Sequence, residues 1–157
     1  MKELIRNIHH QSHGQKGEVY FALFDKYINF SNRKGARDTY IVECAEYLNS
    51  ISFNDSIINR LCEASICYCN DVLDTIGEEL KYFEDIKDVL LLIDPSLLII
   101  PDSKRNEPVV HLELNCEWEE EHGMEWIIRE DRVLYVGAYN GENPWAKFTK
   151  KDSCHYA

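Results

Sequence analysis

The chain has 157 residues, a length typical of one domain and sufficient to bury a hydrophobic core without disulfides or metals. Hydrophobic residues make up 45% of it and charged residues 29%, which excludes a wholly disordered chain. Its 17 basic and 28 acidic side chains give a net charge of −11, which argues against direct binding to nucleic acid or to an anionic membrane surface. Most of the acidic excess lies in residues 78–157, so this half should attract a basic partner, although solubility alone would also explain the charge.

The N-terminal residues and the cysteines indicate in which cellular compartment the protein is expected. The chain starts with charged residues, and no apolar run is long enough for a secretory signal or a membrane span. Six cysteines in such a chain favour reduced, buried thiols over a disulfide framework. Cys67 and Cys69 resemble a chelating pair, but two residues along a helix is a rotation of about 200°, so their thiols should point apart. We therefore expect a cytoplasmic protein.

The first third of the chain is predicted to be loop and then helix. Residues 1–16 show little periodicity and are expected to form a short element followed by a weakly ordered loop. From Tyr20 to Ile28 apolar residues recur at helical spacing, which predicts a helix. Residues 40–51 carry a second helical stripe, with Asp38 or Thr39 as its N-cap.

A third helix has the clearest boundaries. It starts after capping side chains at residues 52–55, and Gly77 is placed to end it as the C′ residue. A fourth segment, about 79–93, is acidic and then strongly apolar, and Pro95 should close it.

After Pro95 the periodicity changes to two, which predicts strands. Residues 97–100 form a short apolar run, and residues 124–129 and 132–139 two strands joined by a turn. Residues 110–118 alternate most regularly. Their expected buried face is Val110, Leu112, Leu114, Cys116 and Trp118, and their expected wet face is His111, Glu113, Asn115 and Glu117.

These elements predict an α+β fold in which N-terminal helices pack on a C-terminal antiparallel β-meander. Residues 1–157 are expected to form a single domain, with residues 147–157 weakly ordered because their pattern is polar and irregular.

The densest cluster of chemically active side chains lies between residues 113 and 125, which hold six glutamates and one histidine. Glu119, Glu120 and Glu121 are consecutive, and adjacent carboxylates repel each other. A cation, the Lys or Arg of a partner, or solvent should offset this repulsion. Gly123 is expected at a positive φ or a bulge, with His122 bonded to neighbouring backbone.

Metal binding and catalysis are weaker interpretations of this cluster. Carboxylates and one imidazole suit Mg, Mn or Zn, but strand positions four apart, such as Glu113 and Glu117, are separated by about 13 Å. The sequence has no H-E-x-x-H pair, no G-x-S-x-G and no phosphate-binding glycine loop. We predict no enzyme activity, no metal and no cofactor. The alternative is a small metal-dependent enzyme that uses residues 117–125.

Aromatic residues are concentrated in the predicted sheet. Trp145 follows a turn at Asn143-Pro144 and should be partly exposed. An aromatic side chain beside carboxylates is a common composition of protein interfaces.

Residues 116–125, followed by residues 133–139 and by Asn143-Pro144-Trp145, resemble an uncharacterised family of small bacterial proteins. Its members look like C-x-W-x-x-E-H-G-x-E followed by a V-L-Y-V-G strand. The resemblance covers about residues 38–145 and implies a bacterial source and no established activity. In size and charge, such proteins are similar to immunity proteins, which neutralise toxins delivered between competing bacteria.

Together these observations predict a non-enzymatic binding protein, an immunity protein that neutralises a basic bacterial toxin such as a nuclease. An acidic antidote can cover a basic cleft by complementary charge. The expected contact residues are Glu113, Glu117, Glu119, Glu120, Glu121, His122 and Trp145. The second candidate surface is the acidic segment around Glu78, Glu79, Glu84 and Asp85.

Overall fold

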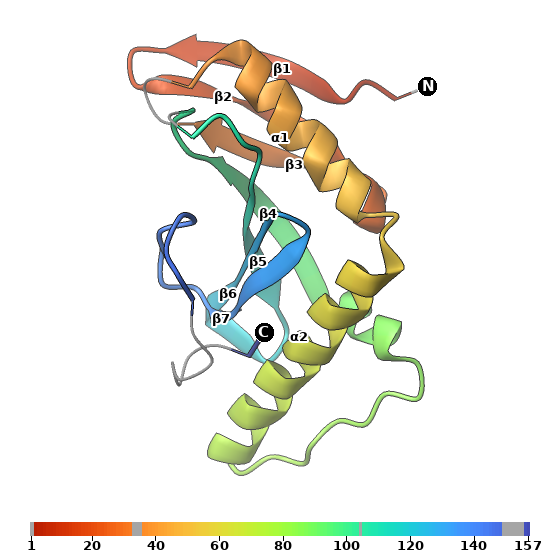
Figure 1. The fold of residues 1–157 in the computed structure, drawn as a ribbon. Helices are drawn as coiled ribbons and strands as arrows, with labels where there is room; N and C mark the ends of the chain where they lie inside the picture. The colour runs from red at the N-terminus through yellow and green to blue at the C-terminus, as the bar shows by residue number, and fades with distance from the viewer. Residues whose placement is uncertain (1, 33–35, 104, 149–155) are drawn as a thin grey trace.

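The computed structural model describes residues 2–32, 36–103, 105–148 and 156–157 (Figure 1). Within these ranges the chain forms a sheet of seven strands in chain order, with two long helices against one face (Figure 1). The strands are β1 (Ile5–Gln11), β2 (Gly14–Phe21), β3 (Lys26–Asn32), β4 (Ile93–Ile100), β5 (Val110–Cys116), β6 (Glu119–Arg129) and β7 (Arg132–Ala138). The helices are α1 (Asp38–Ile51) and α2 (Asp55–Thr75), with short 3₁₀ turns η1 (Ala22–Phe24) and η2 (Ile86–Leu92).

The fold class is α+β, as predicted, but a three-stranded meander precedes the helices. Neighbouring strands are antiparallel except for β3 and β4, which run parallel. A parallel pair needs a long crossover connection, and here α1 and α2 supply it. The two helices therefore sit in the middle of the sheet topology rather than before it.

The prediction for residues 1–28 was wrong. Residues that were expected to form a loop and a helix form the β1–β2 hairpin and the start of β3. The apolar residues from Tyr20 to Ile28 are distributed over the end of β2, the tight turn η1 and the start of β3. Because that connection is so short, apolar residues of β2, η1 and β3 fall three and four positions apart and imitate a helix.

The helices α1 and α2 agree with the sequence prediction to within a residue or two. Arg37 is the N-cap residue of α1 and makes no side-chain cap, so Asp38 lies in the first turn instead. At α2 the Asn54 side chain accepts a hydrogen bond from the backbone N–H of Ile57 at 3.2 Å. Gly77 follows the helix with a φ of 77°, as its C′ position predicted. Among the described residues, no helix is long and apolar enough to cross a bilayer.

The segment after α2 corrects another prediction. Residues 78–85 form an extended loop, and the only helical piece before β4 in this described stretch is η2. The Asn70 side chain holds the loop on α2 because it bonds to both the N–H and the carbonyl of Lys81, at 2.8 and 3.0 Å. Pro95 does not end the segment but lies inside β4, where a bulge interrupts the pairing with β5.

The main core lies between the helices and one face of the sheet. Its largest fully buried members from the strands are Phe21, Phe30, Leu112 and Trp126, which meet Tyr40, Leu48 and Leu61 of the helices. Cys44, Cys62, Cys69 and Cys116 are buried free thiols, as predicted, while Cys67 is exposed and so points away from Cys69. Cys154 lies outside the described residues.

The C-terminal strands follow the predicted pattern. The hairpin of β6 and β7 turns at Glu130 and Asp131, which both have a positive φ, as in the two-residue turns that match strand twist. The segment 139–148 then crosses the face of the sheet that the helices leave free (Figure 1). Of the tail expected to be weakly ordered, residues 149–155 lie outside the described residues, and Tyr156 bonds through its backbone N–H to Val136 at 2.9 Å.

Candidate functional site

Residues 117–123, which we call the glutamate loop, comprise the tight turn after β5 and the bulged start of β6. Cys116 pairs with Glu119, whereas Leu114 pairs with Met124, so β6 holds extra residues opposite β5. Gly123 has a φ of 73°, and a Cβ atom there would lie 2.6 Å from the carbonyl oxygen of Leu114. The bulge therefore requires glycine, as the sequence predicted.

The side chain of Glu119 fastens this loop. Its Oε1 atom accepts hydrogen bonds from the backbone N–H groups of Glu121 and His122, both at 3.2 Å. The Nδ1 atom of His122 lies 3.5 Å from the same oxygen. His122 was expected to fix the turn itself, but the carboxylate of Glu119 does so. A further bond, from the Tyr68 hydroxyl to the Gly123 carbonyl at 3.1 Å, ties the loop to α2.

One part of the glutamate loop has the composition of a cation site. Potential ligand atoms of Glu119, Glu121 and His122 all lie within 4.8 Å of one another. Two carboxylates and an imidazole can coordinate a divalent cation. Glu121 and His122 are exposed to solvent, so an ion there would keep part of its water shell.

The exposed end of the loop adjoins an apolar side chain. A shallow cavity of about 310 Å³ is lined by Leu91, Asp94, Glu117 and Glu120, among others. Leu91, at the end of η2, exposes 81% of its surface. The backbone N–H of Glu117 bonds to the carbonyl of Leu92 at 3.0 Å, which fixes η2 against the loop. We call Leu91, Glu117, Glu120 and Glu121 the acidic surface.

Two expected contact residues lie elsewhere. Glu113 is half-buried on the face of the sheet that the helices leave free, where it pairs with Leu97 and Glu125 in the strand register. Trp145 is partly exposed, as predicted, but it belongs to the segment 139–148 on that same face. The guanidinium groups of Arg105 and Arg129 lie 5.2 and 5.7 Å from its ring centre. The expected contact residues therefore form two groups rather than one.

The helix-free face contains a buried, hydrogen-bonded pair of side chains, His111 and Glu125, that the sequence did not predict. His111 was expected on a wet face, but it exposes 3% of its surface and Glu125 exposes none. The His111 Nε2 atom bonds to the Glu125 carboxylate. The same carboxylate accepts hydrogen bonds from the backbone N–H groups of Asn140 and Glu142, each at 3.0 Å. Glu125 thus anchors the segment 139–148 over the sheet, and that segment buries His111.

The sequence offered one weak signal for this pair. Glu125 stands inside the run Met124-Glu125-Trp126-Ile127-Ile128, in which every residue is buried. A single charge inside an apolar strand is expected to be paired, because an unpaired buried charge is costly. Its partner could not be identified, since His111 lies 14 positions away and on another strand.

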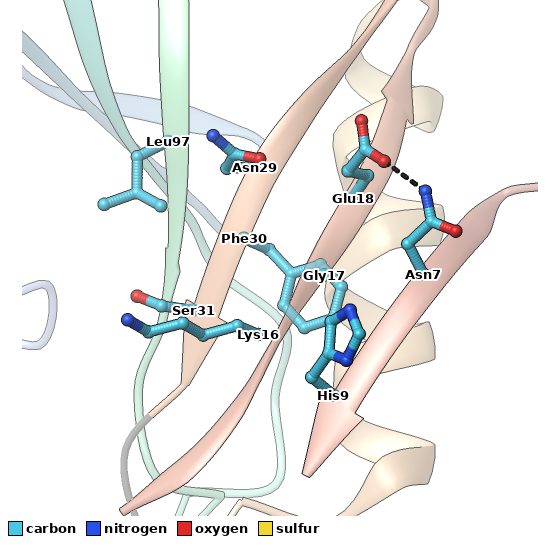
Figure 2. Close-up of a pocket in the computed structure, with 9 residues that line it drawn as sticks. All are labelled: Asn7, His9, Lys16, Gly17, Glu18, Asn29, Phe30, Ser31 and Leu97. Carbon is cyan, nitrogen blue, oxygen red and sulfur yellow. Dashed lines mark hydrogen bonds between the residues drawn. The ribbon is translucent and has the colours of Figure 1, made fainter. Parts of the chain in front are cut away.

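A cavity of about 600 Å³ lies beside His111 on this face. Its walls include Leu97 and Ile99 of β4 and Pro144 and Trp145 of the covering segment. A neighbouring groove of about 630 Å³ runs over β1, β2 and β3, and it shares Ser31 and Leu97 with the cavity (Figure 2). Figure 2 shows Lys16 beside Ser31 in this groove. The cavity and the groove adjoin each other on the helix-free face, and we call the two together the hollow.

A comparison with models of known protein families identifies the family of this chain. A family model described as a domain of unknown function, DUF6985, matches residues 4–144. The chain belongs to this family. The match spans the seven strands and two helices described above, so the DUF6985 domain includes the acidic surface and all the residues that line the hollow except Trp145. This confirms the resemblance to an uncharacterised family. No curated protein and no solved structure matches the chain.

Proposed function

We propose that this DUF6985 protein is a non-enzymatic binding protein that recognises a basic surface of another protein, as an immunity protein recognises a toxin such as a nuclease. The observation that carries the proposal is the acidic surface itself. It presents the exposed Leu91 side chain directly beside the carboxylates of Glu117 and Glu120. Protein interfaces commonly consist of an apolar centre and a polar, solvent-accessible rim.

The rigidity of the loop supports the same conclusion. Glu119 and the Gly123 bulge hold the backbone of the glutamate loop in one conformation before any partner arrives. A preformed surface loses less conformational entropy on binding, so more of the interaction energy remains as affinity. The overall charge of −11 adds long-range attraction toward a basic partner.

The test is a charge reversal on the acidic surface. We would co-express the chain with the product of the neighbouring gene, purify both and measure their affinity by calorimetry. Changing Glu117, Glu120 and Glu121 to Lys should weaken binding at least about a hundredfold, because like charges would then face each other across the interface. Leu91→Ala should weaken it as well. Glu119 is left unchanged because it fastens the loop.

A matched control separates contact from net charge. Reversal of Glu46, Glu63 and Asp74, which are exposed on the two helices, changes the net charge by the same amount. This control should retain most of the affinity. Neither triple variant should lose much thermal stability. An unchanged affinity after reversal of Glu117, Glu120 and Glu121 would remove the acidic surface from the proposal, and the exposed Tyr82 with its acidic neighbours in residues 78–85 would be the next surface.

A metal-dependent enzyme is the second candidate, and the convergence of Glu119, Glu121 and His122 favours it. Calorimetric titration with Mg²⁺, Mn²⁺ and Zn²⁺ tests it. This candidate requires stoichiometric binding that Glu121→Gln and His122→Ala both abolish. Heat changes that persist in these variants would exclude the loop as the binding site.

A further inference from the structure

The register of the sheet aligns a row of side chains across the helix-free face. His9 of β1 lies opposite Lys16 of β2, and Lys16 lies opposite Ser31 of β3. Ser31 in turn is the register partner of Ile99 in β4. Residues directly opposite each other project from the same face of a sheet, and neighbouring strands are about 4.8 Å apart. The row therefore starts with polar groups near the edge of the sheet and becomes apolar at β4.

The polar end of this row holds a cation that no acidic side chain neutralises. Lys16 is exposed, and its ammonium group forms no ion pair within the part of the chain that the structure describes. Glu18 lines the same groove, but Arg6 at 3.4 Å and the Asn7 amide already bind its carboxylate (Figure 2). Lys16 and its register partners His9 and Ser31 thus offer an ammonium, an imidazole N–H and a hydroxyl to one anionic group.

The local charge favours an anion at this end of the hollow, although the chain is acidic overall. Residues 1–32 contain four basic and three acidic side chains, whereas the whole chain carries −11. Asp102 and Glu142 line the adjoining cavity and are not among the residues that line the groove. The groove is therefore the part of the hollow that suits a negative charge.

The apolar part of the hollow begins two strands away from the cation. Half-buried Leu97 lines both the groove and the cavity, and half-buried Ile99 lines the cavity, as do Pro144 and Trp145 of the covering segment. The volumes of the groove and the cavity, about 630 and 600 Å³, each fall within the range of about 300–1,000 Å³ that is usual for ligand sites. Because the two share only Ser31 and Leu97 among their described lining residues, a ligand that occupies both has to be elongated.

We propose that the hollow binds an aliphatic carboxylate, that is, a fatty acid. Its carboxylate pairs with the ammonium of Lys16 and accepts hydrogen bonds from Ser31 and His9. Its alkyl chain passes over Leu97 and ends in the cavity beside Trp145. Burial of the chain supplies affinity, because apolar surface leaves water, and the ammonium selects a carboxylate over a neutral head group. This site lies on the helix-free face and does not depend on the acidic surface.

The test uses three probes that separate the two ends of the ligand. The full chain would be titrated by calorimetry with decanoate, with decan-1-ol and with acetate, at concentrations below those at which decanoate forms micelles. Decanoate should bind at least about tenfold more tightly than decan-1-ol, because the alcohol does not make the charge-assisted hydrogen bonds to Lys16. Acetate should show no measurable binding, because it has no chain to bury.

A brominated chain locates the far end of the ligand. Bromine quenches the fluorescence of a tryptophan that it contacts, so 10-bromodecanoate should quench the emission of Trp145. Trp118 and Trp126 are buried in the main core, between the sheet and the helices, and should keep their emission. Trp145→Phe should abolish the quenching and leave the affinity nearly unchanged.

Three variants of exposed lysines show whether Lys16 holds the carboxylate. Lys16→Gln should lower the affinity for decanoate to that for decan-1-ol and leave the affinity for the alcohol unchanged, whereas Lys16→Arg should retain the preference for decanoate. Lys87→Gln is the matched control, because it removes the same charge from exposed Lys87 of η2, outside the hollow. This control should bind all three probes as the native chain does.

Several results would overturn the proposal. Equal affinities of the native chain for decanoate and decan-1-ol, acetate binding as tight as that of decanoate, or no binding of decanoate would each do so. Quenching that persists in Trp145→Phe would show that the chain does not end in the cavity. Equal losses of affinity in Lys16→Gln and Lys87→Gln would show that net charge, and not a contact with Lys16, governs binding.

Discussion

At the scale of single residues, environment rather than residue type determines what a side chain does. Glu120 and Glu125 lie five positions apart on the same strand, yet one is exposed and the other is fully buried. Glu125 is stable in the interior because His111 and two backbone N–H groups surround its carboxylate. The carboxylate of Glu120 is accessible to solvent or to a partner. The carboxylate of Glu125 instead holds the segment 139–148 on the sheet.

Removal of the buried carboxylate should therefore be costly. Glu125→Ala leaves His111 and the N–H groups of Asn140 and Glu142 without their acceptor. We expect a loss of roughly 3–5 kcal/mol in the free energy of unfolding, measured by urea denaturation. Glu113→Ala, on the same face but half-buried, should cost less than about 1 kcal/mol. Similar losses for the two variants would mean that Glu125 is not the anchor described here.

Trp118 provides a separate test of the main core. It is 8% exposed, and its ring meets that of Tyr68 edge to face at 5.8 Å. Trp118→Ala should cost roughly 3–5 kcal/mol, the range for deletion of a large buried aromatic side chain. A loss below about 1 kcal/mol, measured by the same denaturation, would show that this side chain faces solvent.

The cysteines should differ in reactivity according to burial. Burial raises the pKa of Cys62 to about 11 and that of Cys116 to about 12, so both thiols stay protonated at pH 8. Iodoacetamide should then label the exposed Cys67 in the native protein and reach Cys62 and Cys116 only after unfolding. Peptide mapping by mass spectrometry checks the order, and fast native labelling of Cys116 would contradict it.

At the scale of elements, the sequence signals were reliable where they were local and failed where the connection between two strands was very short. The α2 helix could be predicted because its cap, its long stripe and its terminal glycine agree. β5 could be predicted because it alternates over its whole length. The β2–β3 hairpin could not, because its tight connection merges two strands into an apparent helical stripe.

The glutamate loop depends on one glycine. Gly123→Ala forces a side chain into a positive φ and against the Leu114 carbonyl, which lies 2.6 Å from the Cβ position. We expect a loss of about 1–3 kcal/mol in stability, together with weaker binding of the basic partner as the loop shifts. Gly77→Ala is a useful comparison, because that glycine also has a positive φ but meets no atom within 4 Å. An equal loss at both positions would show that φ strain alone, and not the close approach, matters.

At the scale of the whole molecule, the acidic surface and the hollow lie in different places. The acidic surface lies at the end of β5 and β6, beside η2, whereas the hollow with His111 crosses the helix-free face. The net charge of −11 acts over distances much longer than a hydrogen bond, so it affects the rate of partner encounter more than the fit of the complex.

Salt should therefore slow association with the basic partner. The Debye length falls from about 30 Å at 0.01 M to about 8 Å at 0.15 M ionic strength. We expect the association rate constant, measured by stopped flow, to fall at least about tenfold over this range while the dissociation rate changes little. An association rate constant that does not change with salt would show that long-range electrostatic attraction does not contribute to the proposed binding.

The features that could be predicted from the sequence are those whose signals are local: the two helices, the strands from β4 to β7 in outline, the glycine at the bulge and the buried thiols. These follow from periodicity and backbone chemistry, which neighbouring residues carry in full. Tertiary structure alone decided that residues 5–32 join the sheet and that the segment 139–148 covers its helix-free face. That covering converts His111 from an expected surface residue into half of a buried pair, because burial depends on what folds over a strand and not on the strand itself.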